Sequence, residues 1–189
     1  VTAMTAALEE GWANPSALYQ FGIDAARELR SARAKVAAAM GAEPDRVFFT
    51  SGGTEADNWA IFSTIKRYGK RGKHIITTAM EHHAVLYCMK ELESQGFEVT
   101  YLQPDSLGNI SLESLKNALR PDTILVSIMM VNNELGSVQP LMEVGQLIKE
   151  ANAKYGKNIL FHTDAVQAWG KEEIDVRKLP VDMLSVSGH

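Results

Sequence analysis

Cysteine is nearly absent from this sequence of 189 residues, which contains a single one, Cys88. One cysteine cannot form an internal disulfide framework, so the sequence indicates a reducing compartment, the cytoplasm or an organelle matrix. Long hydrophobic runs are missing too. The longest, Ile124 to Val131, is far shorter than the roughly 20 residues that a membrane-spanning helix needs, and we expect no membrane association.

The chain also lacks an excess of basic residues. Lys and Arg number 19 against 23 Asp and Glu, for a formal net charge of −4. Nucleic-acid binding would require a basic excess or stripe, so nucleic acid is not an expected partner. No secretion signal marks the N-terminus. With 46% apolar residues, the chain has the composition of a soluble, intracellular domain with a buried core.

Helical and strand-type segments alternate along the chain. Periodicity and capping residues predict helices over 25–40, 54–68, 82–95, 111–119 and 142–154. Short apolar or β-branched runs predict strands over 46–50, 74–78, 98–102, 123–130, 158–162 and 181–187. This alternation predicts a three-layer α/β/α fold with a mainly parallel sheet, and no linker indicates a domain boundary. The first and last residues lie within or directly after such elements, which suggests a piece of a longer protein.

Ligands of parallel sheets bind at the carboxyl ends of the strands, so the residues after each predicted strand are candidates. The segment Thr50-Ser-Gly-Gly-Thr-Glu55 leads directly into a helix. Its glycines allow close approach of the backbone, and the free amides of the helix start favour an anion. The alternative is an ordinary strand–helix turn with Thr54 as the N-cap.

Histidine and amide side chains follow the next strands. His82, in Ala79-Met-Glu-His-His-Ala84, could stack on a planar ring or move protons, or could be a polar helix-start residue without a role. Adjacent histidines point in different directions on a helix, so they are poor joint metal ligands, and we expect no metal. Val131-Asn-Asn-Glu-Leu-Gly136 could orient a polar ligand or complete a turn.

A carboxylate completes the set. Asp164, in His162-Thr-Asp-Ala-Val-Gln167, follows a buried strand and needs a cationic or hydrogen-bonding partner, because an unpaired buried carboxylate is costly. Ser187-Gly-His189 follows the last strand. An anion cradle, imidazole, amides and one carboxylate at one sheet edge suit a planar, phosphorylated ligand with a cationic nitrogen. Pyridoxal 5′-phosphate is such a ligand.

Five motifs in this order resemble those of the NifS/IscS-type cysteine desulfurases, which belong to the class V aminotransferase group of fold type I pyridoxal-phosphate enzymes. They are Ser-Gly-Gly-Thr-Glu-Ala-Asp-Asn (51–58), Glu-His-His-Ala-Val (81–85), Val-Asn-Asn-Glu-Leu-Gly (131–136), His-Thr-Asp-Ala-Val-Gln (162–167) and Ser-Val-Ser-Gly-His (185–189). The resemblance spans essentially the whole chain. It implies that residues 1–189 are a fragment of the cofactor-binding large domain.

The resemblance implies a role for each matching residue. The phosphate contacts are Gly53, Thr54, Ser187 and His189. His82 would stack on the cofactor ring and manage protons at the substrate thiol, and Asp164 would keep the pyridine nitrogen protonated. Both would be catalytic. Asn133 and Gln167 would lie near the ring oxygen.

The implied reaction removes sulfur from L-cysteine, giving L-alanine and a persulfide on a cysteine of the enzyme. The resemblance also implies a homodimer and sulfur-acceptor or iron–sulfur scaffold proteins as partners. Alternatives are a selenocysteine lyase, another class V enzyme, or a catalytically silent scaffold of the same fold. The cofactor-binding lysine, the small domain and the sulfur-accepting cysteine loop of the family fall outside this sequence.

Cys88 is not the expected sulfur acceptor. It lies nearly two helical turns after His82, about 9 Å along the axis from the predicted site. Its neighbours Leu86, Tyr87 and Met89 suit a buried, inert thiol better than a reactive thiolate.

Overall fold

A computed structural model describes residues 2–10 and 13–188. The chain forms two compact units, Val1–Phe49 with Asp175–Arg177, and Thr50–Ile174 with Lys178–His189. The first unit holds three helices and the second holds a sheet with its covering helices.

The first unit consists of α1 (Thr2–Glu10), α2 (Gln20–Met40) and the short 3-10 helix η1 (Pro44–Arg46). Helix α2 ends where the sequence predicts, because Gly41 adopts a left-handed conformation with φ of 70° and closes the last turn. The helix starts five residues earlier than the periodicity indicates. It buries few side chains, and Phe21 on its first turn is 73% exposed.

The strand predicted over 46–50 is wrong. Arg46 ends η1, which Pro44 begins, and residues 47–50 pair with no strand. The Val47 carbonyl accepts its hydrogen bond from the Arg33 guanidinium at 3.0 Å instead of from a neighbouring strand. Phe48 and Phe49 are exposed, so their β propensity is not supported by burial.

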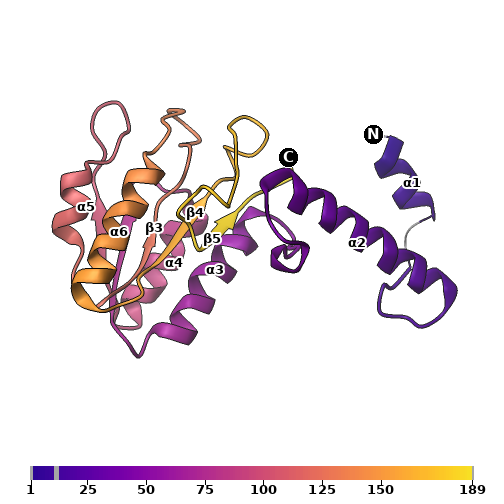
Figure 1. Cartoon of the computed structure of the whole chain (residues 1–189), viewed down its shortest axis with the longest axis horizontal. Helices are drawn as coiled ribbons and strands as arrows, with labels where there is room; N and C mark the ends of the chain where they lie inside the picture. Colours follow the sequence, from indigo (N-terminus) through magenta and orange to yellow (C-terminus); the bar gives the residue numbers. More distant parts are fainter. Residues whose placement is uncertain (1, 11–12, 189) are drawn as a thin grey trace. The chain divides into compact units, whose positions relative to one another are not determined.

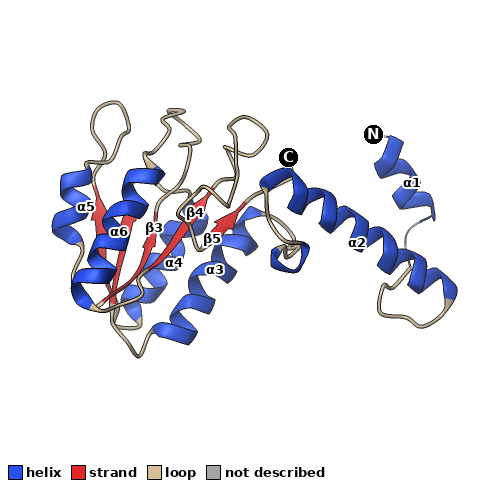
Figure 2. Ribbon diagram, in the orientation of Figure 1, coloured by secondary structure: helices blue, strands red, loops and turns tan. Residues whose placement is uncertain are grey.

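The second unit is built on a five-stranded sheet in the order β2-β1-β3-β4-β5, with every pair parallel (Figure 2). The strands are β1 (His74–Thr78), β2 (Glu98–Leu102), β3 (Thr123–Ser127), β4 (Leu160–Asp164) and β5 (Met183–Ser185). The parallel sheet confirms the predicted fold class. β1 and β2 have the predicted bounds.

Three predicted strands are too long or shifted. Strand 123–130 ends at Ser127, strand 158–162 is Leu160–Asp164, and strand 181–187 is Met183–Ser185. Burial continues after β3 to Met130, and the Ile128 and Met130 amides still donate to carbonyls of β4. There the Met129 amide donates to a side chain, Glu81 Oε1, at 2.9 Å.

Four helices cover the sheet: α3 (Gly53–Tyr68), α4 (His83–Ser94), α5 (Leu112–Ala118) and α6 (Leu141–Tyr155). All lie within a residue or so of their predicted bounds, and Ser111 caps α5 as predicted. Crossovers between parallel strands are right-handed. The step from β1 to β2 runs toward one side of the sheet, and the later steps run toward the other side. As a result α4 lies on one face of the sheet, and α5 and α6 lie on the other (Figure 1).

The core lies between the sheet and these helices. On the α3–α4 face, Ile61, Val85 and Leu92 pack against Ile75 and Leu125 of the central strands. Within the described residues, no helix is long and apolar enough to cross a membrane, and no group of three or more His, Cys, Asp or Glu side chains could hold a metal ion. This core packs against β1 and β3, between which the strand order reverses, and ligands of parallel sheets bind at the carboxyl ends of such strands.

Candidate functional site

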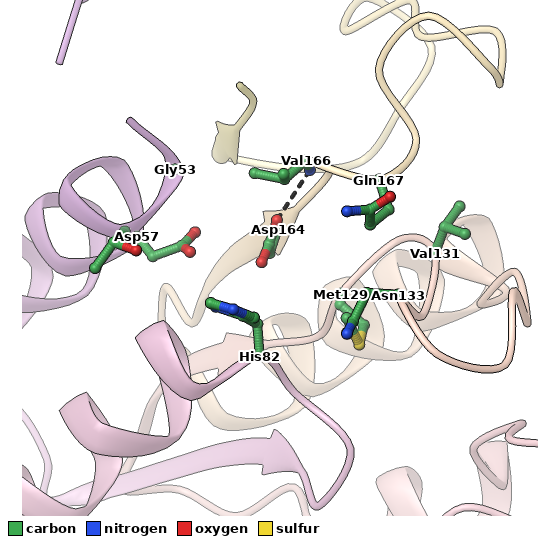
Figure 3. A pocket seen from close by; sticks show the side chains of 10 residues that line it. Gly53, Asp57, His82, Met129, Val131, Asn133, Asp164, Val166 and Gln167 are labelled. Carbon is green, nitrogen blue, oxygen red and sulfur yellow. Dashed lines mark hydrogen bonds between the residues drawn. The ribbon is translucent and has the colours of Figure 1, made fainter. Parts of the chain in front are cut away.

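A cavity of about 140 Å³ opens at the carboxyl ends of the strands (Figure 3). The start of α3, the β1–α4 turn and the loops after β3 and β4 contribute its walls. Its lining residues are Gly53, Thr54, Asp57, His82, Met129, Val131, Asn133, Asp164, Val166 and Gln167. Six residues singled out in the sequence therefore meet in one cavity: Gly53, Thr54, His82, Asn133, Asp164 and Gln167.

Helix α3 points its amino end at the cavity. Gly53 is its first residue, and the first amides of a helix have no acceptor within it, so they favour a negative group. A Cβ on Gly53 would lie 2.7 Å from Val166 Cγ2. Only glycine lets α3 pack this closely on the loop after β4. Thr54 adds an exposed hydroxyl.

His82 is the N-cap of α4. Its Nδ1 accepts a hydrogen bond from the Ala84 amide at 3.2 Å, so the neutral ring carries its proton on Nε2. The side chain is exposed, and Figure 3 shows the ring rising from the β1–α4 turn toward Asp164. A ring fixed by its cap, with a free Nε2 edge, can stack on a ligand or exchange a proton.

Asp164 is the last residue of β4 and is buried. One oxygen, Oδ1, accepts the Val166 amide at 2.9 Å, and Figure 3 shows the other turned away toward His82. Burial raises the pKa of Asp164, whereas the Val166 hydrogen bond opposes the rise. The carboxylate is oriented, but burial leaves it in need of a cation.

The two adjacent asparagines have different roles. Asn132 is buried and braces the loop, since its amide donates to the Met80 carbonyl at 3.1 Å and its oxygen accepts the Glu134 and Leu135 amides. Asn133 is exposed and lines the cavity. The turn interpretation is therefore confirmed for Asn132, whereas a ligand-orienting role for Asn133 stays a prediction.

Gln167 and Ser187 lie at different parts of the site. Gln167 lines the cavity, with its Oε1 accepting a hydrogen bond from Lys171 at 3.0 Å. Ser187 is not a lining residue, but its Cβ is 4.0 Å from the position of a Cβ on Gly53, beside the start of α3. His189, the remaining predicted phosphate contact, lies outside the described residues.

Sequence reasoning assigned no role to two buried carboxyls, Asp57 and Glu81. Glu81 Oε1 accepts the Thr78 hydroxyl at 2.8 Å and the Met129 amide at 2.9 Å, which ties the His82 turn to the loop after β3. Burial raises the pKa of Glu81 to about 8. Asp57 lies one helical turn after Gly53, a spacing that could have placed it at the cavity.

Cys88 is buried in α4, as predicted. Its thiol donates to the Ala84 carbonyl at 3.0 Å, and burial raises its pKa to about 11. At neutral pH this thiol is protonated and inaccessible, the opposite of a reactive thiolate.

Comparison with known proteins identifies the family. The chain matches the family described as aminotransferase class-V over residues 1–189. The chain belongs to the class V aminotransferase family. It is 51% identical over 189 residues to a cysteine desulfurase IscS of Methanosarcina thermophila, covering 100% of this chain and 45% of that protein. It is 51% identical over 176 residues to a putative cysteine desulfurase IscS 1 of Bacillus subtilis, covering 93% of this chain and 45% of that protein.

Solved structures of this family share the fold. A NifS-like protein superposes with a TM-score of 0.94 at 41% identity, covering all of this chain and 50% of its own. A structure of SspA in complex with cysteine gives a TM-score of 0.91 at 40% identity, covering 100% and 52%. The expected NifS/IscS resemblance is confirmed. The chain spans about half the length of the relatives it matches.

Proposed function

We propose that the protein containing this chain is a pyridoxal-phosphate-dependent cysteine desulfurase, which takes sulfur from L-cysteine and releases L-alanine. The observation that carries the proposal is the oriented, buried carboxyl of Asp164 at the cavity that α3 and His82 line. The names of the similar proteins support the same activity.

The residues at the cavity suit the cofactor. No ion pair joins Asp164 to a lysine or arginine among the described residues, so its charge is available to a cationic ring nitrogen. The amino end of α3, with Gly53 and Thr54, suits a phosphate, and Ser187 lies beside it. Asn133 and Gln167 present amides that suit a ring oxygen.

Each side chain then has a defined task. Pyridoxal phosphate, when bound, withdraws electrons from the Cα of the amino acid. Asp164 would hold the proton on the ring nitrogen and so would maintain that withdrawal. His82, with its proton on Nε2, would stack on the ring and would hold or move a proton at the substrate sulfur.

The sulfur acceptor belongs to another part of the protein, because Cys88 is buried and protonated. A persulfide requires an exposed thiolate that can meet the substrate and then a partner. Sulfur-acceptor or iron–sulfur scaffold proteins would take the sulfur onward.

We infer a homodimer as well. The apolar side chains exposed on the first unit, among them Leu18 and Phe21, support contact with a second copy.

The test is Asp164→Asn in the complete protein, with alanine formation from L-cysteine as the readout. The amide keeps the oxygen that accepts the Val166 amide but cannot hold the ring nitrogen protonated, so we expect a loss of at least about 100-fold. Asp105→Asn, at an exposed loop carboxylate, is the control and keeps the parent rate. Parent activity in Asp164→Asn would refute the proposal.

A further inference from the structure

A second buried carboxyl, Asp57, faces the same cavity as Asp164. It lies one turn into α3, lines the cavity and is 1% exposed. Figure 3 shows its carboxyl extending from α3 toward Asp164. Two buried carboxyls that line one cavity and interact electrostatically cannot both ionise at low cost, so the charge of the pair determines which ligand the cavity accepts.

Asp57 has no compensating cation within the described chain. Its Oδ1 makes no hydrogen bond there, and His162 Nε2 lies 3.6 Å from it. His162 is fully buried between two hydroxyls, with Nδ1 2.9 Å from Ser127 Oγ and Nε2 3.0 Å from Ser185 Oγ. Burial lowers the pKa of His162 to about 4, so the ring is neutral and supplies no positive charge.

The other titratable groups around Asp57 are not cations either. Glu81, in the turn after β1, and Cys88, in α4, both interact electrostatically with Asp57. Asp164, on β4, adds a like charge. The cluster therefore gains nothing by ionising a second carboxyl, and it retains protons instead.

The surroundings of the two carboxyls differ in a way that decides where the proton lies. Asp164 accepts the Val166 amide, and this hydrogen bond stabilises its negative form. Asp57 is more fully buried. Burial raises its pKa to about 7, the charge of Asp164 adds to the rise, and only a hydrogen bond from Ser185 opposes it. The favoured arrangement is a neutral Asp57 beside an ionised Asp164.

We propose that Asp57 is a positioning residue that holds the one proton shared by the Asp57–Asp164 pair, so that Asp164 alone is ionised toward the ligand. The pair then presents a single negative charge, which matches a single cationic ring nitrogen. The inference rests on the proposed function for the identity of that ligand, but the position of the proton belongs to the cofactor-free protein.

The experiment is infrared spectroscopy of the cofactor-free complete protein at pH 6, where a protonated carboxyl gives a carbonyl band distinct from carboxylates. We expect Asp57→Asn to lose one such band relative to the parent, and Asp164→Asn to retain it. Glu81, protonated in all three proteins, cancels in the differences. Asp105→Asn, an exposed carboxylate, should lose no protonated-carboxyl band.

A second readout follows the same proton. The folded state binds it more tightly than the unfolded state, so the free energy of unfolding of the parent falls as the pH rises between 3.8 and about 7. In Asp57→Asn, the contribution of this proton to the fall in unfolding free energy should be absent. A band lost in Asp164→Asn but kept in Asp57→Asn would overturn the proposal, as would unchanged spectra in both. If Asp57→Asn does not fold, absence of the band from Asp164→Asn is the contradicting result.

Discussion

The two edges of the parallel sheet differ in whether their charged side chains have partners of opposite sign. At the amino ends of the strands, the two terminal guanidinium nitrogens of Arg120 each donate to one carboxylate oxygen of Glu98, both at 2.6 Å, in a fork. The Nε of Arg120 donates to Asp122 Oδ1 at 2.8 Å. This pairing lowers the pKa of Glu98 and raises that of Arg120. Every charge in this cluster has a partner of opposite sign.

At the carboxyl ends, three buried carboxyls share no lysine or arginine partner among the described residues. Asp57, Glu81 and Asp164 are each at most 6% exposed, and burial raises the pKa of all three. Such groups destabilise the ionised folded state, and they cluster at sites where function opposes stability. One edge thus stabilises the fold through paired charges, whereas the other keeps buried carboxyls that have no cationic partner among the described residues.

Buried histidines do not account for this difference. His74, at the amino edge, lies between Thr123 and Thr100 hydroxyls at 2.7 and 2.8 Å, much as His162 lies between two serines near the cavity. Burial lowers the pKa of both to about 4. Both rings are neutral, so the carboxyls set the charge at the cavity edge.

The largest stability effect is expected at Glu81. Glu81→Ala removes the acceptor of the Thr78 hydroxyl and the Met129 amide and leaves both buried, which should cost about 3 kcal/mol of unfolding free energy. Glu81→Gln keeps an acceptor oxygen, and because the pKa of Glu81 is about 8 it also matches the neutral form present at pH 7. Denaturant unfolding should therefore give Glu81→Gln an unfolding free energy within about 1 kcal/mol of that of the parent. Equal losses of unfolding free energy in Glu81→Ala and Glu81→Gln would show that the charge of Glu81, rather than its hydrogen bonds, stabilises the fold.

A smaller effect is expected at the opposite edge. Arg120→Ala breaks the fork with Glu98, but the pair is partly exposed, so the melting temperature should fall by only roughly 2–4 °C. High salt should shrink the difference from the parent, since it screens exposed pairs. Thermal unfolding at low and high salt checks this. A loss independent of salt would mean that packing of the arginine side chain, not its charge, stabilises this edge.

Much of the second unit follows from the sequence because burial repeats there with regular spacing. β1 and β2 have the predicted bounds, and the capping residue Ser111 lies at the expected start of α5. The motif residues of the cavity could be placed together because the carboxyl ends of parallel strands meet at one edge.

The rest depends on tertiary contacts that no local pattern encodes. Asp57 looks like an ordinary polar residue of a surface helix, and only the packing of α3 on the sheet buries it. Glu81 is adjacent to His82, but its partner, Met129, is 48 residues away. The predicted strand at 46–50 failed because no neighbouring strand pairs with it, a property of the fold that its apolar residues cannot show.

The most direct test of the cavity edge is the equilibrium binding of pyridoxal phosphate to the complete protein, measured for the parent, Asp164→Asn and Arg120→Ala. Asp164→Asn removes the carboxylate that we propose pairs with the cationic ring nitrogen, so it should weaken binding at least about 10-fold, as expected for a lost charged hydrogen bond. Arg120→Ala changes the opposite edge and should bind like the parent. Parent affinity in Asp164→Asn, or an equal loss in both variants, would contradict the assignment of this edge as the cofactor site.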